Sequence, residues 1–144
     1  MSRFTRFTSI ALLAALGVST SALAAEEHDL LAAPLTQAPG RELTALTVTY
    51  GPGQSTRPHH HGADAFVYVL SGRIRSQLEG GPERVYSPGE SWFEPAGAHH
   101  VVSGNASAEQ PATMLVVFVA KPAAELTAMD SPAQAPVPAR TQSK

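Results

Sequence analysis

The fold is decided by residues 53–105, which read GQSTRPHHHGADAFVYVLSGRIRSQLEGGPERVYSPGESWFEPAGAHHVVSGN. Short runs of β-branched and aromatic residues alternate here with turns rich in Gly, Pro and Ser. On either side, residues 42–50 alternate apolar and polar side chains, and residues 112–120 form a longer apolar run. Short strands separated by Gly and Pro turns are typical of β-sandwiches and β-barrels. The sequence therefore predicts an all-β domain, and the expected strands are residues 42–50, 65–70, 73–79, 84–86, 91–94, 99–103 and 112–120.

Five of the six histidines fall into two clusters, His59-His60-His61 and His99-His100. Residues two apart on an extended strand point to the same side, so His59 and His61 can bind one ion together while His60 points away. By the same rule, only one of His99 and His100 can face inward. Imidazole is a common metal ligand, and three such ligands leave positions open for water or substrate. Spacing alone leaves the alternative that these are solvated loop histidines.

The residues around both clusters resemble the two signature motifs of the cupin superfamily. The matching positions are Gly53, His59, His61 and Gly72 in the first motif and Gly89, Pro95, Gly97, His100 and Asn105 in the second, with one extra residue before Asn105. The resemblance covers residues 53–105 and implies a single-domain, cupin-type jelly-roll β-barrel, which we place at residues 42–121. It also implies that His59, His61 and His100 bind one divalent metal ion, and that His60 and His99 point outward or support the ligands.

One position departs from the family pattern. Seven residues before Gly72, where the family usually has a glutamate ligand, this chain has Ala65. Three alternatives remain: the histidines and water hold the ion, another carboxylate replaces the glutamate, or the site has lost its metal. Asp64 is adjacent, but strand alternation would point it away. Glu94 is the better candidate, because it shares a strand face with Trp92 and a carboxylate in an apolar barrel is costly unless it is paired or metal-bound.

Both ends of the chain differ in composition from the middle. Residues 1–24 combine a positively charged start, an uncharged apolar run and small residues at Ala22 and Ala24, which is typical of a secretory signal peptide. Residues 25–41 form an N-terminal segment. Residues 122–144 are rich in Pro and Ala and poor in large apolar residues, which predicts a disordered tail. We therefore expect a periplasmic or secreted protein.

The composition excludes several classes of protein. The chain has 144 residues, which suits one domain. It has no cysteine, so disulfides, thiolate metal sites and cysteine nucleophiles are excluded. Its formal net charge is −2, so the basic excess of a nucleic-acid-binding protein is missing. No stretch after residue 24 is long and apolar enough to span a membrane, so none is expected in the mature form.

These features predict a metal-binding cupin that acts on a small molecule. The expected cofactor is one divalent transition metal, Fe, Mn, Ni, Cu or Zn, which could polarise an oxygen ligand or activate dioxygen. The first hypothesis is an oxygenase or isomerase-type enzyme with Glu94 as catalytic base. The alternatives are a non-catalytic module that binds a small ligand or metal, and a structural cupin that forms a homodimer through its apolar outer sheet.

Overall fold

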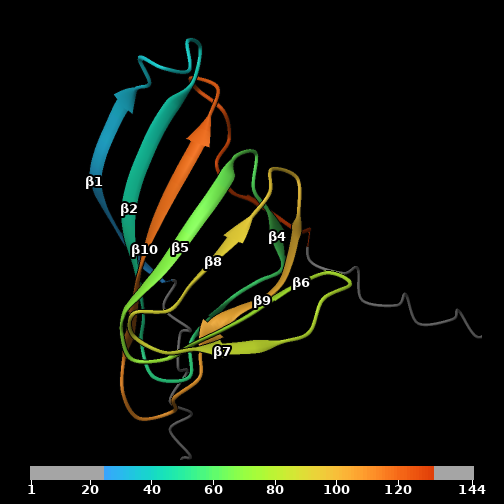
Figure 1. The fold of residues 1–144 in the computed structure, drawn as a ribbon. Coiled ribbons are helices and arrows are strands. Elements are labelled where there is room, and N and C mark those ends of the chain that lie inside the picture. Colours follow the sequence, from blue (N-terminus) through green and yellow to red (C-terminus); the bar gives the residue numbers. More distant parts are fainter. Residues whose placement is uncertain (1–24, 132–144) are drawn as a thin grey trace, which may run out of the picture.

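Two antiparallel β-sheets face each other and curl around a common interior (Figure 1). The structure is a computed structural model that describes residues 25–131. The predicted signal peptide at residues 1–24 and the last part of the predicted tail, residues 132–144, lie outside the described residues. Every element in the described part is a strand, which confirms the predicted all-β class. No helix that could cross a membrane occurs among residues 25–131.

The first sheet has five strands in the order β1-β2-β10-β5-β8. Its strands are β1 (Glu26–Pro34), β2 (Glu42–Tyr50), β10 (Ala112–Ala120), β5 (Asp64–Ser71) and β8 (Ser91–Glu94). The long apolar strand β10 lies at its centre, between β2 and β5, as Figure 1 shows. Buried and less buried residues alternate along β10 and most of β5, because successive side chains of a strand point to opposite faces.

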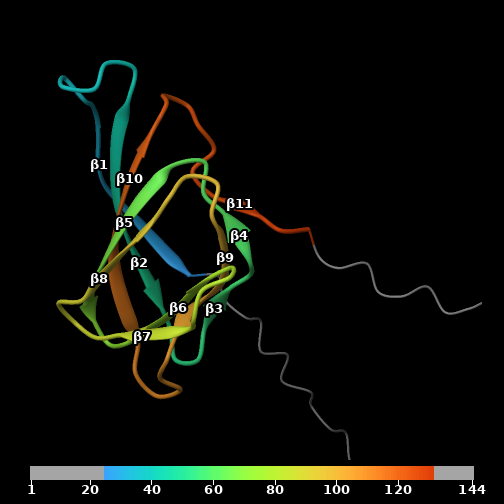
Figure 2. The ribbon, with the colours of Figure 1, turned by 45° about the vertical axis from the view of Figure 1, so that its right-hand side comes forward.

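The second sheet follows the order β11-β4-β9-β6-β7, and β3 pairs with β9 (Figure 2). Its strands are β11 (Ala128–Met129), β4 (His59–His60), β9 (His99–Asn105), β6 (Ile74–Leu78), β7 (Arg84–Tyr86) and β3 (Ser55–Thr56). The two sheets bury an apolar core between them, in which Val69 and Ile74 are fully inaccessible to solvent. This core holds the two histidine-bearing strands, β4 and β9, at a fixed register.

Two elements fall outside the predicted barrel limits of residues 42–121. Strand β1 comes from the N-terminal segment and extends the first sheet at its edge. Strand β11 comes from the predicted disordered tail, so residues 122–131 differ from that prediction and take a defined path. The reason is local, because β11 pairs with β4 while Ala124 and Leu126 pack against the core. The prediction averaged the composition of residues 122–144, and the many Pro and Ala residues outweighed the few residues that form β11 and contact the core.

The outer face of the first sheet exposes large apolar side chains on β5 and β8. These side chains are Phe66, Tyr68, Leu70 and Phe93. The expected homodimer depends on this surface, and it stays a prediction.

The turn between β5 and β6 requires glycine at position 72. Gly72 has a φ of +69°, and a Cβ atom there would lie 2.5 Å from the Pro111 carbonyl oxygen. Gly80 has a φ of +78° but nothing within 4 Å of its Cβ position, so it provides a matched control. We expect Gly72→Ala to lower the free energy of unfolding by about 3 kcal/mol and Gly80→Ala by about 1 kcal/mol, since only the first adds a steric clash to the backbone strain. Urea unfolding of both variants measures the difference, and equal losses would contradict this account of the turn.

Candidate metal centre

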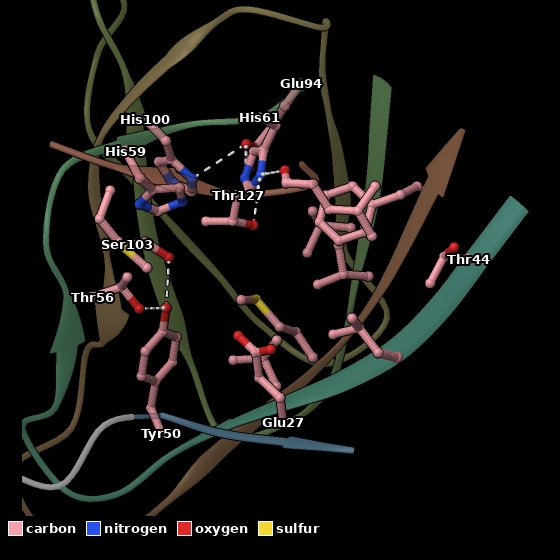
Figure 3. Close-up of a pocket in the computed structure, with 18 of the residues that line it drawn as sticks. Glu27, Thr44, Tyr50, Thr56, His59, His61, Glu94, His100, Ser103 and Thr127 are labelled. Carbon is pink, nitrogen blue, oxygen red and sulfur yellow. Dashed lines mark hydrogen bonds and ion pairs between the residues drawn. The ribbon is translucent and has the colours of Figure 1, made fainter. Parts of the chain in front are cut away.

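The structure brings the three predicted histidines together inside the barrel (Figure 3). Antiparallel pairing of β4 with β9 places His59 opposite His100 and His60 opposite His99. His59 and His100 therefore point inward, and His61 joins them from the residue after β4. One ring nitrogen from each of the three lies within 4.8 Å of the others, and all three side chains are buried. His60 and His99 point outward and stack on each other with ring centroids 4.3 Å apart.

Each inward histidine uses one ring nitrogen for a structural contact and leaves the other available. His59 Nδ1 donates to the Arg57 carbonyl oxygen at 2.7 Å, and His61 Nδ1 donates to the Leu126 carbonyl oxygen at 2.9 Å. His100 Nε2 bonds the Ser76 hydroxyl at 2.9 Å. Such contacts fix the ring orientation and the tautomer of metal-binding histidines. The free atoms are thus His59 Nε2, His61 Nε2 and His100 Nδ1.

Glu94 places a carboxylate beside two of these histidines, His61 and His100. Its side chain is 1% exposed, and its Oε1 accepts a hydrogen bond from Trp92 Nε1 at 2.7 Å. Its Oε2 lies 3.2 Å from both His61 Nε2 and His100 Nδ1, and neither contact satisfies hydrogen-bond geometry. Ligands that share one ion with bonds of 2.0–2.1 Å are separated by about 3.0–3.4 Å, so this spacing fits a metal site.

The inward carboxylate of this chain, Glu94, lies on β8, whereas the family pattern places its glutamate at the position of Ala65 on the neighbouring strand β5. Strand β5 pairs with β8 so that Ala65 lies directly opposite Glu94. Cross-strand partners share a face of the sheet, so a glutamate at either position would point into the barrel. Asp64 points away as predicted, and its Oδ1 accepts a hydrogen bond from the exposed backbone amide of Ala96. Of the alternatives left open by the sequence, the geometry favours a Glu94 contribution.

The electrostatics of the cluster suit a cation. Burial lowers the pKa of His59 to about 4, and the neighbouring imidazoles add to this, so its ring is neutral and ready to bind a metal. Burial alone would raise the pKa of Glu94, but His100, His61 and the Trp92 indole hold it well below its usual range. Burial would lower the pKa of His61, and the Glu94 carboxylate overcomes this effect and raises it.

Two buried polar atoms of this cluster have no hydrogen-bond partner, Glu94 Oε2 and His100 Nδ1. A buried, ionised carboxylate oxygen without a donor is costly. A divalent ion bound to both atoms would remove that cost, because it supplies positive charge and bonds to both lone pairs. The residues present therefore fit a metal ion held by the three imidazoles, with the Glu94 carboxylate beside two of them.

The cluster lies at one end of a cavity of about 420 Å³. Apolar side chains form most of the wall: Leu46, Val48, Val67, Met114, Val116 and Phe118. Tyr50 also lines the cavity, with its hydroxyl fixed by Thr56 at 2.7 Å and Ser103 at 2.9 Å. Burial raises the pKa of Tyr50, so its phenol is neutral. A volume of this size accommodates a small organic molecule.

A C-terminal strap, residues 124–131, covers part of the cavity. Leu126, Thr127 and Met129 line the cavity, and the Leu126 carbonyl orients His61. On the outside of the barrel, the Asp130 carboxylate contacts His99 Nε2 at 2.9 Å and His60 Nδ1 at 3.4 Å. The strap is therefore attached to the outside of the barrel through Asp130, and it lines the cavity and orients His61 on the inside. Sequence reasoning missed it because a carbonyl contact leaves no trace in side-chain identity.

Removing the strap is expected to weaken metal binding. Deletion of residues 124–144 removes the Leu126 carbonyl and exposes the cavity, whereas deletion of residues 132–144 leaves the strap intact and serves as control. Loss of such a supporting contact typically costs 10–100-fold in metal affinity, and we expect about that loss for the longer deletion only. Calorimetric titration of both truncated proteins with Co²⁺, alongside their melting temperatures without metal, separates site geometry from overall stability. If both truncated proteins fold and bind Co²⁺ with equal affinity, the strap does not support the metal site.

The chain belongs to the cupin family, because the family model described as a cupin domain matches residues 46–118. This match includes both histidine clusters and Glu94, and it confirms the cupin-type barrel expected from the sequence motifs. A search of curated proteins found no match.

Several solved structures share the fold. DMSP lyase DddQ from Ruegeria pomeroyi DSS-3 is 22% identical over 83% of this chain and 57% of that chain, with a TM-score of 0.61. An uncharacterised double-stranded β-helix protein from Klebsiella pneumoniae subsp. pneumoniae MGH 78578 is 17% identical over 74% of this chain and 85% of that chain, with a TM-score of 0.58. Oxalate oxidase in complex with glycolate is 24% identical over 69% of this chain and 52% of that chain, with a TM-score of 0.54. This chain thus spans about half the length of the lyase and oxidase chains, and the likeness shows the fold.

Proposed function

We propose that this chain is a metal-dependent cupin enzyme that acts on a small molecule in the periplasm or outside the cell. One divalent transition ion is held by His59, His61, His100 and Glu94. The observation that carries the proposal is the pair of buried, unpartnered atoms, Glu94 Oε2 and His100 Nδ1, which face each other at 3.2 Å. A divalent ion beside them would bond both atoms at once.

The ligand set determines what chemistry the site can support. A divalent ion held by these residues would supply Lewis-acid chemistry or, as iron or copper, dioxygen chemistry. Oxygenase or isomerase-type reactions of a small oxygen-bearing substrate fit this arrangement. Glu94 then acts as a ligand, because its Oε2 lies at ligand spacing from two imidazoles and its side chain is buried. In this proposal Glu94 binds the metal ion, whereas the sequence led us to expect it to act as the catalytic base.

The cavity and the comparisons support a small-molecule substrate. The wall is mainly apolar, and its few polar groups, such as the Tyr50 hydroxyl, are fixed by hydrogen bonds. Two of the similar structures are named as an oxalate oxidase and a DMSP lyase, both of which act on small molecules. The proposed location depends on the predicted signal peptide at residues 1–24, which N-terminal sequencing of the mature protein can check.

The experiment that tests this function uses full-length protein expressed and purified without chelators or affinity tags. Elemental analysis should find about one transition ion per chain. The purified protein is then incubated with small-molecule extract of the expressing cells, and mass spectrometry follows which compounds are consumed. Consumption by the wild type but not by His61→Ala supports an enzyme. Full metal occupancy with no compound consumed would instead identify the non-catalytic binding module.

A further inference from the structure

Three hydroxyl groups form a cluster in the wall of the cavity. They belong to Tyr50 at the end of β2, Thr56 on β3 and Ser103 on β9, and all three residues line the cavity. Tyr50 is 2% exposed and Ser103 is 3% exposed. Figure 3 shows the Tyr50 hydroxyl directed toward Thr56 and Ser103, on the side of the cavity where His59 and His100 lie. The cluster is therefore a polar site in a wall that is otherwise mainly apolar.

The strands that carry the metal-binding histidines also position this cluster. Strand β9 pairs Ser103 with Thr56 and, three residues away, His100 with His59. Three residues of strand span about 10 Å, and they would normally place His100 and Ser103 on opposite faces. The register of β9 on β6 shifts between His100 and Ser103, and this bulge lets both side chains face the interior. One rigid ladder thus fixes the hydroxyl cluster relative to the metal centre.

The cluster has one more O–H proton than its own hydrogen bonds use. The Tyr50 hydroxyl bonds Thr56 Oγ1 at 2.7 Å and Ser103 Oγ at 2.9 Å. Within residues 25–131, the hydroxyls of Thr56 and Ser103 make no other hydrogen bond. Each bond uses one proton and the three groups carry three, so one O–H is left to donate whichever way the bonds run. Burial raises the pKa of Tyr50, so the phenol keeps its proton and the count holds.

We propose that this cluster binds a carbonyl oxygen of the substrate, while the metal centre binds the carboxylate of the same small keto acid. The inference deepens the proposed function and rests on it, since the carboxylate end needs the metal ion. A buried donor without an acceptor is costly, and a carbonyl oxygen supplies the missing acceptor. A second carboxylate fits less well, because no Lys or Arg is among the described residues that line the cavity.

Binding of matched acids to the cobalt-loaded protein tests the inference. Pentanoate and 4-oxopentanoate differ only in that a keto group replaces one methylene group, and hexanoate and 5-oxohexanoate repeat the comparison with a longer spacer. The visible absorption of Co²⁺ and calorimetry report binding without any need for turnover. For each protein, the ratio of the two affinities within a pair measures its preference for the keto group.

The triple variant Tyr50→Phe, Thr56→Val, Ser103→Ala removes all three hydroxyls and leaves none of them unpaired, so the core should tolerate it. In at least one pair of acids, we expect its preference for the keto acid to be about five- to tenfold below that of the wild type. The matched control is Thr49→Val, Thr113→Val, which removes a hydrogen-bonded hydroxyl pair on the outer face of the same sheet and should keep the full preference.

Infrared spectra of the wild-type complex with the isotope-labelled keto acid give a second measurement that needs no variant. A hydrogen bond lowers the stretching frequency of a C=O group, so we expect a lower value than for the same acid in an apolar solvent. An unshifted band, or an equal preference in the wild type and the triple variant, would overturn the inference and leave the proposed function intact. Failure of the wild type to bind cobalt would overturn the proposed function, and the inference with it.

Discussion

Replacing His61 with alanine is expected to abolish tight binding of a divalent transition ion, whereas replacing its neighbour His60 should leave binding unchanged. The two residues are adjacent in sequence, but His61 Nε2 faces Glu94 inside the barrel and His60 stacks on His99 outside it. Loss of a direct ligand should exceed the 10–100-fold cost of losing a supporting contact, so we expect more than about a 100-fold fall in affinity for His61→Ala.

A second pair of variants repeats this comparison on the other strand. His100→Ala should behave like His61→Ala, and His99→Ala should behave like His60→Ala, because β4 and β9 present one histidine of each cluster to each face. Calorimetric titration with Co²⁺ measures all four affinities. Loss of tight binding in the outer variants, or its retention in the inner ones, would place the ion elsewhere.

The second large effect concerns the position of the carboxylate. Glu94→Ala should remove the anionic ligand and weaken metal binding by more than about 100-fold. The double variant Glu94→Ala, Ala65→Glu should recover most of this loss, because the two positions lie directly opposite each other on β8 and β5. The exchange also keeps the total volume of the two side chains, so the core tolerates it better than Ala65→Glu alone.

Ala65→Glu alone provides the control for this exchange. It places a second glutamate beside Glu94 in a buried space, where Ala65 is fully inaccessible to solvent, so it should destabilise the fold. Melting temperatures and Co²⁺ affinities of the three variants together separate packing from coordination. A double variant that folds but binds no better than Glu94→Ala would show that Glu94 acts through something other than ligation.

Strand alternation explains why much of this site could be predicted from the sequence. It separated His59 and His61 from His60, and it turned Asp64 away from the interior, both as the structure shows. The cost of burying a carboxylate identified Glu94 before its position was known. Period-two patterning also gave most of the barrel strands, since buried and exposed residues alternate along them.

Other parts of the site depend on contacts that side-chain patterns do not encode. The Leu126 carbonyl orients His61, and any residue at position 126 would supply a carbonyl. On the outer face, the strap is held by one acidic side chain, Asp130, and by the two-residue strand β11, which is too little to stand out in a Pro- and Ala-rich tail. Glu27 lines the cavity because the register between β1 and β2 places it opposite Val48, and only the structure provides that register.

The central claim is that His59, His61, His100 and Glu94 converge on one ion. The most direct test is a crystal structure of the cobalt-loaded protein with data collected at the cobalt absorption edge, so that anomalous scattering locates the metal. The account predicts one strong peak within about 2.0–2.2 Å of three imidazole nitrogens and a Glu94 carboxylate oxygen. A peak only at the outer His60, His99 and Asp130 cluster, or no peak inside the barrel, would contradict it.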